Sequence, residues 1–151
     1  MMTNTTFVYE IYIATTRNKL WEALTSSDII KKYWFDLQIQ TDWQVGSIVS
    51  FLDKNGKITD KGKVLINEPF QLLSYTFQWL EDKTIRERPT TVSFELKQIN
   101  SFVKLTLKHL DLLPTDFVEE NDGFKGYNNG WPMILSNLKS LLETGETLTP
   151  E

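Results

Sequence analysis

The chain of 151 residues carries 16 Lys and Arg against 20 Asp and Glu, for a net charge of −4, and it contains no cysteine. This length fits a single domain with one hydrophobic core. The Lys and Arg residues form no basic patch that would follow a phosphate backbone, so we expect no nucleic-acid partner. The absence of cysteine excludes a disulfide framework, thiolate metal ligands and a cysteine nucleophile.

The N-terminal sequence "MMTNTTFVYEIY" has neither the positive start nor the long apolar run of a secretion signal. No apolar run in the sequence approaches the roughly 20 residues that a membrane-spanning helix needs. We therefore expect a cytoplasmic protein without a membrane span.

Apolar and polar residues alternate over residues 7–14, which predicts a strand. The period changes at Thr15 and Thr16, and a Thr at this point is placed to cap a short helix that extends through Leu24. The segment "TSSD" restarts a second short helix that extends through Trp34. Two short helices are therefore expected after the first strand.

Strand patterns dominate the middle of the chain. The expected strands cover residues 45–53, 61–67, 70–79, 91–99 and 102–110. Between the first two of them, Asn55 and Gly56 in "DKNGK" predict a turn, because both residue types tolerate a positive φ. Successive strands joined by short turns form an antiparallel sheet.

The run "LEDKTIRERP" separates the strand at residues 70–79 from the next one. Its charged residues are Glu81, Asp82, Lys83, Arg86, Glu87 and Arg88. Mixed charges of this kind are typical of a solvated hairpin loop, and we interpret the cluster in this way. The alternative is that Glu87 or Arg88 acts on a substrate at a cavity mouth, as a carboxylate does when its pKa is raised.

Leu135, Leu138 and Leu142 recur at helical spacing near the end of the chain. We expect one helix over residues 132–143, with Pro132 in its first turn, where the missing N–H is no loss. The three leucines are expected to be buried against the sheet. The predicted fold is α+β: a curved antiparallel sheet of about six or seven strands around a long C-terminal helix, with two short helices after the first strand.

Several segments carry a more specific signal. They are "LWEALTSSDIIKKYWF", "GSIVSF" with a following DxxG turn, "KGKVLINEPFQLLSYTFQW", "TTVSFELKQINSFVKLTLKH" and "NGWPMILSNLKSLLETG". In this order they resemble the START-like (SRPBCC) superfamily, and within it the homologues of the heat-shock-protein ATPase activator. The resemblance implies a single START-like domain over residues 1–151, with its core at about 7–147, and a helix-grip fold with a cavity between sheet and helix in many members.

Aromatic residues make up 13% of the chain, and several fall on strand positions that we assign to the concave face of the sheet. Rings that converge from strands, helices and loops suit an apolar ligand pocket, and they also suit a filled core. The candidate ligand-binding residues are Trp34, Phe51, Tyr75, Phe77, Trp79, His109 and Trp131.

His109 is the only histidine, which excludes a metal site built from several imidazoles, and we expect neither a metal nor a cofactor. The residue shares strand parity with Val103, Leu105 and Leu107, so its side chain is expected to point inward. We interpret His109 as a core or rim residue with its hydrogen bonds satisfied. The alternative is a polar group that binds ligand at the cavity rim.

These features favour a module that binds a small hydrophobic or amphipathic molecule between the sheet and the C-terminal helix. No Ser-His-Asp arrangement, pair of inward carboxylates or phosphate loop is recognisable, so no catalytic residue is assigned. Two alternatives stay open: a cyclase- or dehydratase-type enzyme that uses the same cavity, and a chaperone partner that acts through its surface. A homodimer also stays open.

Overall fold

The computed structural model describes residues 4–120 and 125–148. Along these residues the chain forms β1 (Thr5–Ile13), α1 (Arg17–Thr25), α2 (Ser27–Tyr33), β2 (Gln38–Gln40), β3 (Ile48–Leu52), β4 (Ile58–Glu68), β5 (Leu72–Trp79), β6 (Thr90–Ile99), β7 (Phe102–Leu112), the short 3-10 helix η1 (Pro114–Asp116) and α3 (Tyr127–Thr144). The expected succession of a strand, two short helices, a series of strands and a long final helix is confirmed.

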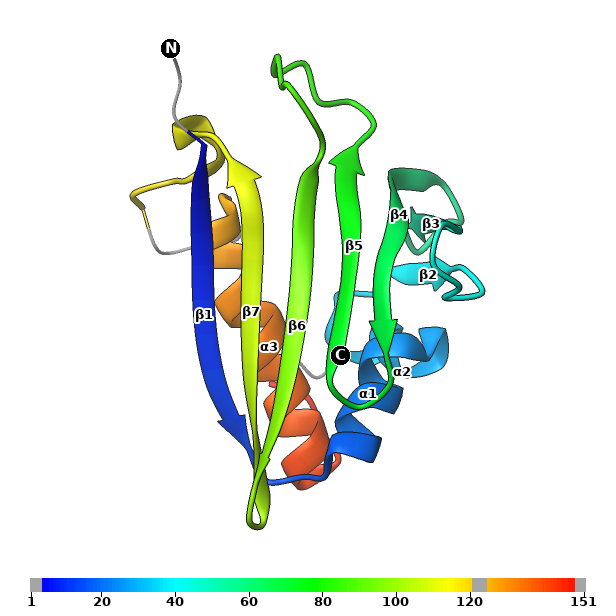
Figure 1. The fold of residues 1–151 in the computed structure, drawn as a ribbon, viewed down its shortest axis with the longest axis vertical. Coiled ribbons are helices and arrows are strands. Elements are labelled where there is room, and N and C mark those ends of the chain that lie inside the picture. The colour runs from blue at the N-terminus through cyan, green and yellow to red at the C-terminus, as the bar shows by residue number, and fades with distance from the viewer. Residues whose placement is uncertain (1–3, 121–124, 149–151) are drawn as a thin grey trace.

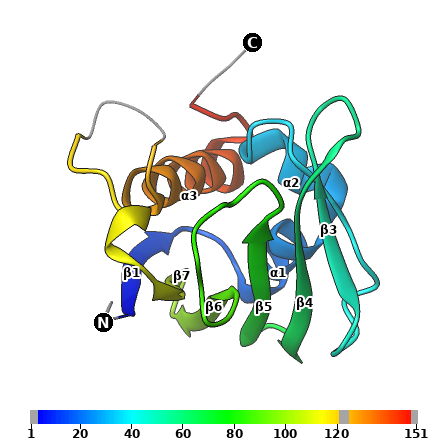
Figure 2. The ribbon, with the colours of Figure 1, turned by 90° about the horizontal axis from the view of Figure 1, so that it is seen from above.

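The described strands form one seven-stranded sheet in the order β1-β7-β6-β5-β4-β3-β2, and every neighbouring pair is antiparallel. α1 and α2 carry the chain from β1 at one edge to β2 at the opposite edge, and hairpins then return it to β7 beside β1 (Figure 1). The sheet is curved, and α3 lies across its concave side (Figure 2). The predicted α+β class is therefore confirmed.

Among the described strands, β2 is the one that the sequence pattern does not predict. It has three residues with a single buried apolar side chain, Ile39, and this is too short to show an alternating pattern. Its pairing with β3, which places Ile39 opposite Phe51, makes it a strand. A short strand at a sheet edge also offers little backbone for pairing with another chain.

The strand register aligns one row of side chains across the concave face. Phe7 pairs with His109, His109 with Val92, Val92 with Tyr75, and Tyr75 with Val64. Because successive residues of a strand alternate between the two faces, this row fixes which side of each strand faces α3. The inward orientation that the sequence predicts for Tyr75 and His109 is therefore confirmed.

α3 packs one side against the sheet. The buried apolar residues on this side are Trp131, Ile134, Leu135 and Leu138. The burial predicted for Leu135 and Leu138 is confirmed, whereas the burial predicted for Leu142 is wrong, because this residue is only partly buried. Leu142 lies one turn beyond Leu138 on the same side of the helix, so its place in the last turns, rather than its orientation, leaves it accessible.

α3 begins at Tyr127 rather than at residue 132, so the predicted start of this helix is wrong and Pro132 lies inside it. Asn128 explains the earlier start, because its side chain ties the preceding segment to the first helical turn. Its Oδ1 accepts a bond from the Val118 N–H at 3.0 Å, and its Nδ2 donates to the Val118 carbonyl at 2.9 Å. Asparagine and glycine indicate a turn in the sequence, and this long-range pairing is what makes them helical.

Two local features expected from the sequence are confirmed. The Lys19 N–H donates to Oγ1 of Thr16 at 3.2 Å, so Thr16 caps α1. In the turn between β3 and β4, Gly56 has a φ of 85°, and Oδ1 of Asp53 accepts a bond from the Asn55 N–H at 2.9 Å. These bonds fix the ends of α1 and of the β3–β4 hairpin.

Candidate functional site

A pocket of about 500 Å³ lies at the end of the sheet where α3 begins. The end of β5, the β5–β6 connection, the segment around η1 and the first turns of α3 surround it, toward the upper end of the molecule in Figure 1. Its walls are formed by Trp34, Phe35, Phe77, Trp79, Asp82, Thr84, Arg86, Thr115, Asp116, Val118, Gly126, Tyr127, Gly130, Trp131 and Ile134.

Aromatic rings form the apolar wall of the pocket. Trp34, which follows α2, and Trp131 of α3 meet edge to face with ring centroids 5.2 Å apart. Phe77 of β5 and Tyr127 of α3 meet in the same way at 6.4 Å. Trp131 is almost fully buried, so its indole closes the inner end of the pocket. The structure thus brings together the two tryptophans that the sequence places on separate helices.

An ion-pair cluster of Asp82, Arg86 and Asp116 forms the polar wall. Nη1 and Nη2 of Arg86 donate to the two carboxylate oxygens of Asp116 at 2.7 and 2.6 Å, and Nε donates to Asp82 at 2.7 Å. Such a bidentate pair is both strong and geometrically specific. It joins the β5–β6 connection to η1, which are two sides of the pocket.

Both carboxyls of this cluster are held ionised. Burial opposes the charge of Asp82, but the bonds from Arg86 and from Thr84 outweigh it, so the pKa of Asp82 is lowered. Burial also opposes the charge of Asp116, and the bonds from Arg86 and from the Leu113 N–H keep the pKa of Asp116 below its ordinary value. The two acids therefore stay charged at neutral pH.

His109 forms a chain of hydrogen bonds behind the pocket wall. Trp131 Nε1–H donates to His109 Nδ1 at 3.0 Å, and Nε2 of His109 lies 2.9 Å from Oγ1 of Thr90, whose hydroxyl donates to the Phe77 carbonyl at 2.7 Å. An indole N–H is only a donor, so Nδ1 must accept and Nε2 must carry the proton. Burial lowers the pKa of His109 to about 3. The imidazole is therefore neutral at physiological pH.

The seven candidate ligand-binding residues separate into two groups. Trp34, Phe77, Trp79 and Trp131 line the pocket, and Trp79 is half exposed at its rim. Phe51 and Tyr75 lie in the core with ring centroids 5.7 Å apart, and His109 is covered by Tyr127 and Trp131. These three residues are fully buried, and they support the wall without forming part of it.

The interpretation of the charged β5–β6 connection as a solvated loop is wrong for Arg86 and Asp82, whose side chains are each 13% exposed. It fits Glu87 and Arg88, whose side chains are 83% and 57% exposed. Arg86 and Asp82 are more buried than Glu87 and Arg88 because Arg86 pairs with Asp116, which follows β6 and β7 in the sequence. Sequence patterns report neighbours along the chain and contain no signal for this pair.

A curved antiparallel sheet that holds a long C-terminal helix, with a pocket at one end of the interface, is the helix-grip fold of START-like domains. The profile of one family with this fold, described as "Activator of Hsp90 ATPase homolog 1-like protein", matches residues 14–143. The chain belongs to this family. The resemblance seen in the sequence segments is thereby confirmed.

Solved structures support the same fold. A protein from Mesorhizobium loti is 25% identical, with a TM-score of 0.74 over 91% of this chain and 96% of the other. The Aha1 dimer from Colwellia psychrerythraea is 24% identical, with a TM-score of 0.71 over 93% and 98%. An HSP90 activator from Plasmodium falciparum is 16% identical, with a TM-score of 0.61 over 95% and 90%. No curated protein matches the chain significantly.

Two further properties concern the described residues only. None of their helices is long and apolar enough to cross a membrane. In this part of the chain, no group of three or more His, Asp or Glu side chains is arranged to hold a metal ion.

Proposed function

We propose that this protein binds a small amphipathic molecule in the pocket between the sheet and the start of α3. The observation that carries the proposal is a pocket of about 500 Å³ with aromatic walls and one charged end. Ligand sites typically have volumes of roughly 300–1,000 Å³, mostly apolar walls and a few placed polar groups. Trp34 and Trp131 would contact the apolar part of the ligand, and the cluster around Arg86 its polar end.

The ionisable groups of the pocket favour binding over a cyclase- or dehydratase-type reaction. A general acid or base works best when its pKa lies near the operating pH. Asp82 and Asp116 are held well ionised by Arg86, and burial raises the pKa of Tyr127 to about 12. Burial also raises the pKa of Asp60, but this residue lies outside the pocket lining and accepts a bond from Thr59 at 2.6 Å.

A second candidate function is contact with a chaperone through the surface, as the family description implies. The observation that favours it is a set of exposed apolar side chains beside the pocket mouth: Trp79, Leu80 and Ile85. Exposed apolar patches often mark protein-binding sites. The two functions share Trp79 at the pocket rim, whereas Leu80 and Ile85 do not line the pocket and would serve this contact alone.

Titration with the neutral dye N-phenyl-1-naphthylamine, read by the fluorescence of the dye, tests the proposal. We expect the wild type to bind the dye more tightly than about 1 mM, equivalent to some −4 kcal/mol. Ile134→Phe adds a ring to a residue of the pocket wall, so it should weaken binding about tenfold, since filling the pocket removes room for the dye.

Met133→Phe is the matched control, because Met133 precedes Ile134 in α3 but does not line the pocket. It should leave the affinity for the dye unchanged. Absence of binding to the wild type, or an equal loss in both variants, would overturn the proposal.

A further inference from the structure

The charged residues in the described lining of the pocket carry a net negative charge. They are Asp82, Arg86 and Asp116, so two carboxylates stand against one guanidinium. Arg86 directs three N–H groups at these carboxylates. These bonds use three of the five N–H groups of Arg86, and each carboxylate also accepts a backbone N–H, from Leu113 or from Thr84, so hydrogen-bonding capacity alone sets no preference. The excess negative charge makes the polar end of the pocket better suited to a cation than to an anion.

The charged groups that act on the Tyr127 hydroxyl are also mostly negative, like those of the pocket lining. Burial is the main reason why the pKa of Tyr127 is raised to about 12, and the negative charges of Asp116 and Asp60 add to it, while Arg86 opposes them. Asp60 pairs with Phe51 in the strand register, so it lies on the concave face of the sheet. The pocket therefore has a negative potential at the start of α3.

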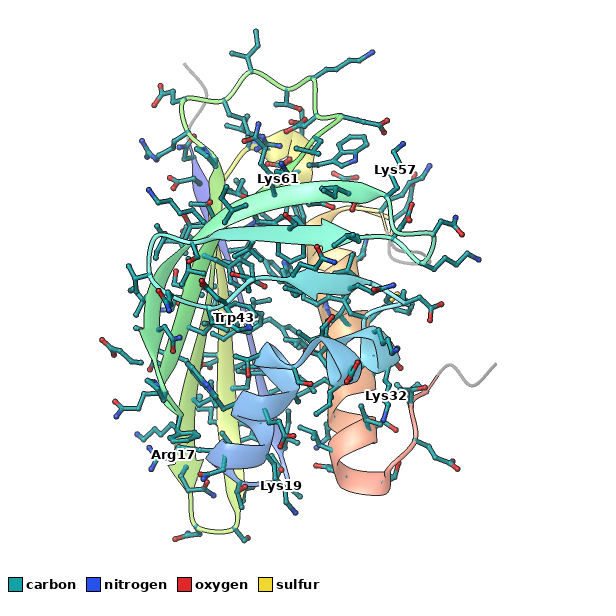
Figure 3. The ribbon with its side chains drawn as sticks, turned by 90° about the vertical axis from the view of Figure 1, so that its right-hand side faces the viewer. Arg17, Lys19, Lys32, Trp43, Lys57 and Lys61 are labelled. Atoms are coloured by element: carbon teal, nitrogen blue, oxygen red, sulfur yellow. The ribbon has the colours of Figure 1, made fainter. Side chains whose placement is uncertain are left out.

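Two neighbouring cations are paired with acidic residues outside the pocket lining. Nζ of Lys57 lies 3.9 Å from Glu81, and Arg88 binds Asp111 at 2.9 Å, all through exposed or partly exposed side chains. Figure 3 shows Lys57 at the turn between β3 and β4, directed outward. The N-terminus of α3 adds about half a positive charge, which is less than the one excess negative charge of the lining.

The apolar wall attracts cations as well. The rings of Trp34, Phe77, Tyr127 and Trp131 line the same pocket as the carboxylates. Aromatic faces attract organic cations through their π electrons, and this attraction grows when the cation is removed from water. A carboxylate at the same place meets the aromatic faces without this gain and is repelled by the excess negative charge.

We propose that the pocket selects amphipathic molecules with a cationic polar end, such as alkylamines and quaternary ammonium compounds, over fatty acids. The inference rests on the proposed binding function and adds the charge of the ligand to it. The ammonium group lies against Asp82 and Asp116, and the alkyl chain lies between Trp34 and Ile134.

Three ligands of one chain length test the selection: decyltrimethylammonium, decanol and decanoate. Each ligand is titrated into the wild type loaded with N-phenyl-1-naphthylamine, at neutral pH and below the critical micelle concentration of that ligand, and displacement of the dye measures its affinity. We expect affinity to fall in this order, with decyltrimethylammonium at least about tenfold tighter than decanoate.

Asp82→Asn supplies the matching change in the protein. It keeps an acceptor oxygen for Arg86 and removes the excess charge of the lining, so the preference for decyltrimethylammonium over decanoate should shrink by about threefold or more. Glu81→Gln is the control, because it removes the same charge from the adjacent residue, whose side chain is exposed and lies outside the pocket lining. Its preference should stay at the wild-type value.

The outcomes separate the two proposals. If decanoate displaces the dye as well as or better than decyltrimethylammonium, the inference on charge is overturned, while the binding function stands. An equal change of preference in Asp82→Asn and Glu81→Gln overturns it too, because the charge would then act from the surface. If neither the dye nor any of the three ligands binds the wild type, the binding function fails and the inference fails with it.

Discussion

α3 meets the sheet in two different ways along its length. In its middle, Leu135 and Leu138 are buried in a closely packed apolar core. At its start, Tyr127 and Trp131 face a pocket whose far side is an ion-pair cluster on other segments. The first contact follows from the spacing of leucines along one helix, and the second depends on loops that are far apart in sequence. Helical periodicity therefore indicates which side of α3 faces the sheet, but not where a pocket remains between the helix and the sheet.

The packed region should be the more sensitive of the two to loss of volume. Leu138→Ala is expected to lower the free energy of unfolding by about 2–5 kcal/mol, because the buried leucine leaves a cavity. Leu142→Ala, on the same side of α3 but only partly buried, should cost clearly less. Urea denaturation of both variants measures the difference. A cost below about 0.5 kcal/mol for Leu138→Ala would show that α3 does not pack as described.

The pocket end should depend on charge rather than volume. Arg86→Met removes the shared guanidinium from two mostly buried carboxylates, and we expect a loss of about 1–3 kcal/mol in the free energy of unfolding. Arg88→Met is the matched control, because Arg88 forms a more exposed ion pair with Asp111, and exposed pairs contribute less than about 1 kcal/mol. Equal costs for the two variants in urea denaturation would contradict the structural role of Arg86.

His109 of β7 is hydrogen-bonded to Trp131 of α3 and to Thr90 of β6. Its contribution to the free energy of unfolding should depend on pH. The unfolded chain takes up this proton near pH 6.5, whereas the folded chain does so only at a pKa of about 3. The free energy of unfolding should therefore fall as the pH is lowered below 6.5, by up to about 1.4 kcal/mol per pH unit from this residue. Urea denaturation at pH 7, 6 and 5 measures the slope.

His109→Gln is the comparison for that slope. Glutamine does not titrate, so the variant should lose stability less steeply than the wild type between pH 6.5 and 5. Carboxyl groups titrate in both proteins, and the difference between the two slopes isolates the histidine. Parallel slopes would show that His109 is not held neutral by burial.

The sequence predicts the fold because its signals are local. The alternation in β7 and the leucine spacing in α3 each reflect one covered face, and β7 and the leucine-bearing part of α3 lie where the patterns place them. The start of α3 is missed because Asn128 becomes helical only through its bonds with Val118. β2 is missed because a three-residue strand has too few positions to show a period.

The site is predicted less completely than the fold, for the same reason. Trp34 and Trp131 are recognisable as large rings on helices expected to face the sheet, and both line the pocket. Phe51 and Tyr75 have the same strand pattern as Phe77, but their places farther inside the sheet bury them. Arg86 and Asp116 are paired by the folding of two loops, and no spacing along the chain indicates this contact.

The most direct test of ligand binding at the start of α3 uses the five tryptophans. Indole N–H signals in a ¹⁵N correlation spectrum report each ring separately during titration with decyltrimethylammonium. The signals of Trp34 and Trp131 should shift, whereas those of Trp21 and Trp43, which lie outside the pocket lining, should stay in place. Figure 3 shows Trp43 between α1 and the strands β2–β4, where its indole N–H donates to the Thr25 carbonyl at 2.8 Å. Unchanged signals of Trp34 and Trp131, or equal shifts of all rings, would contradict a binding site at this end of the helix.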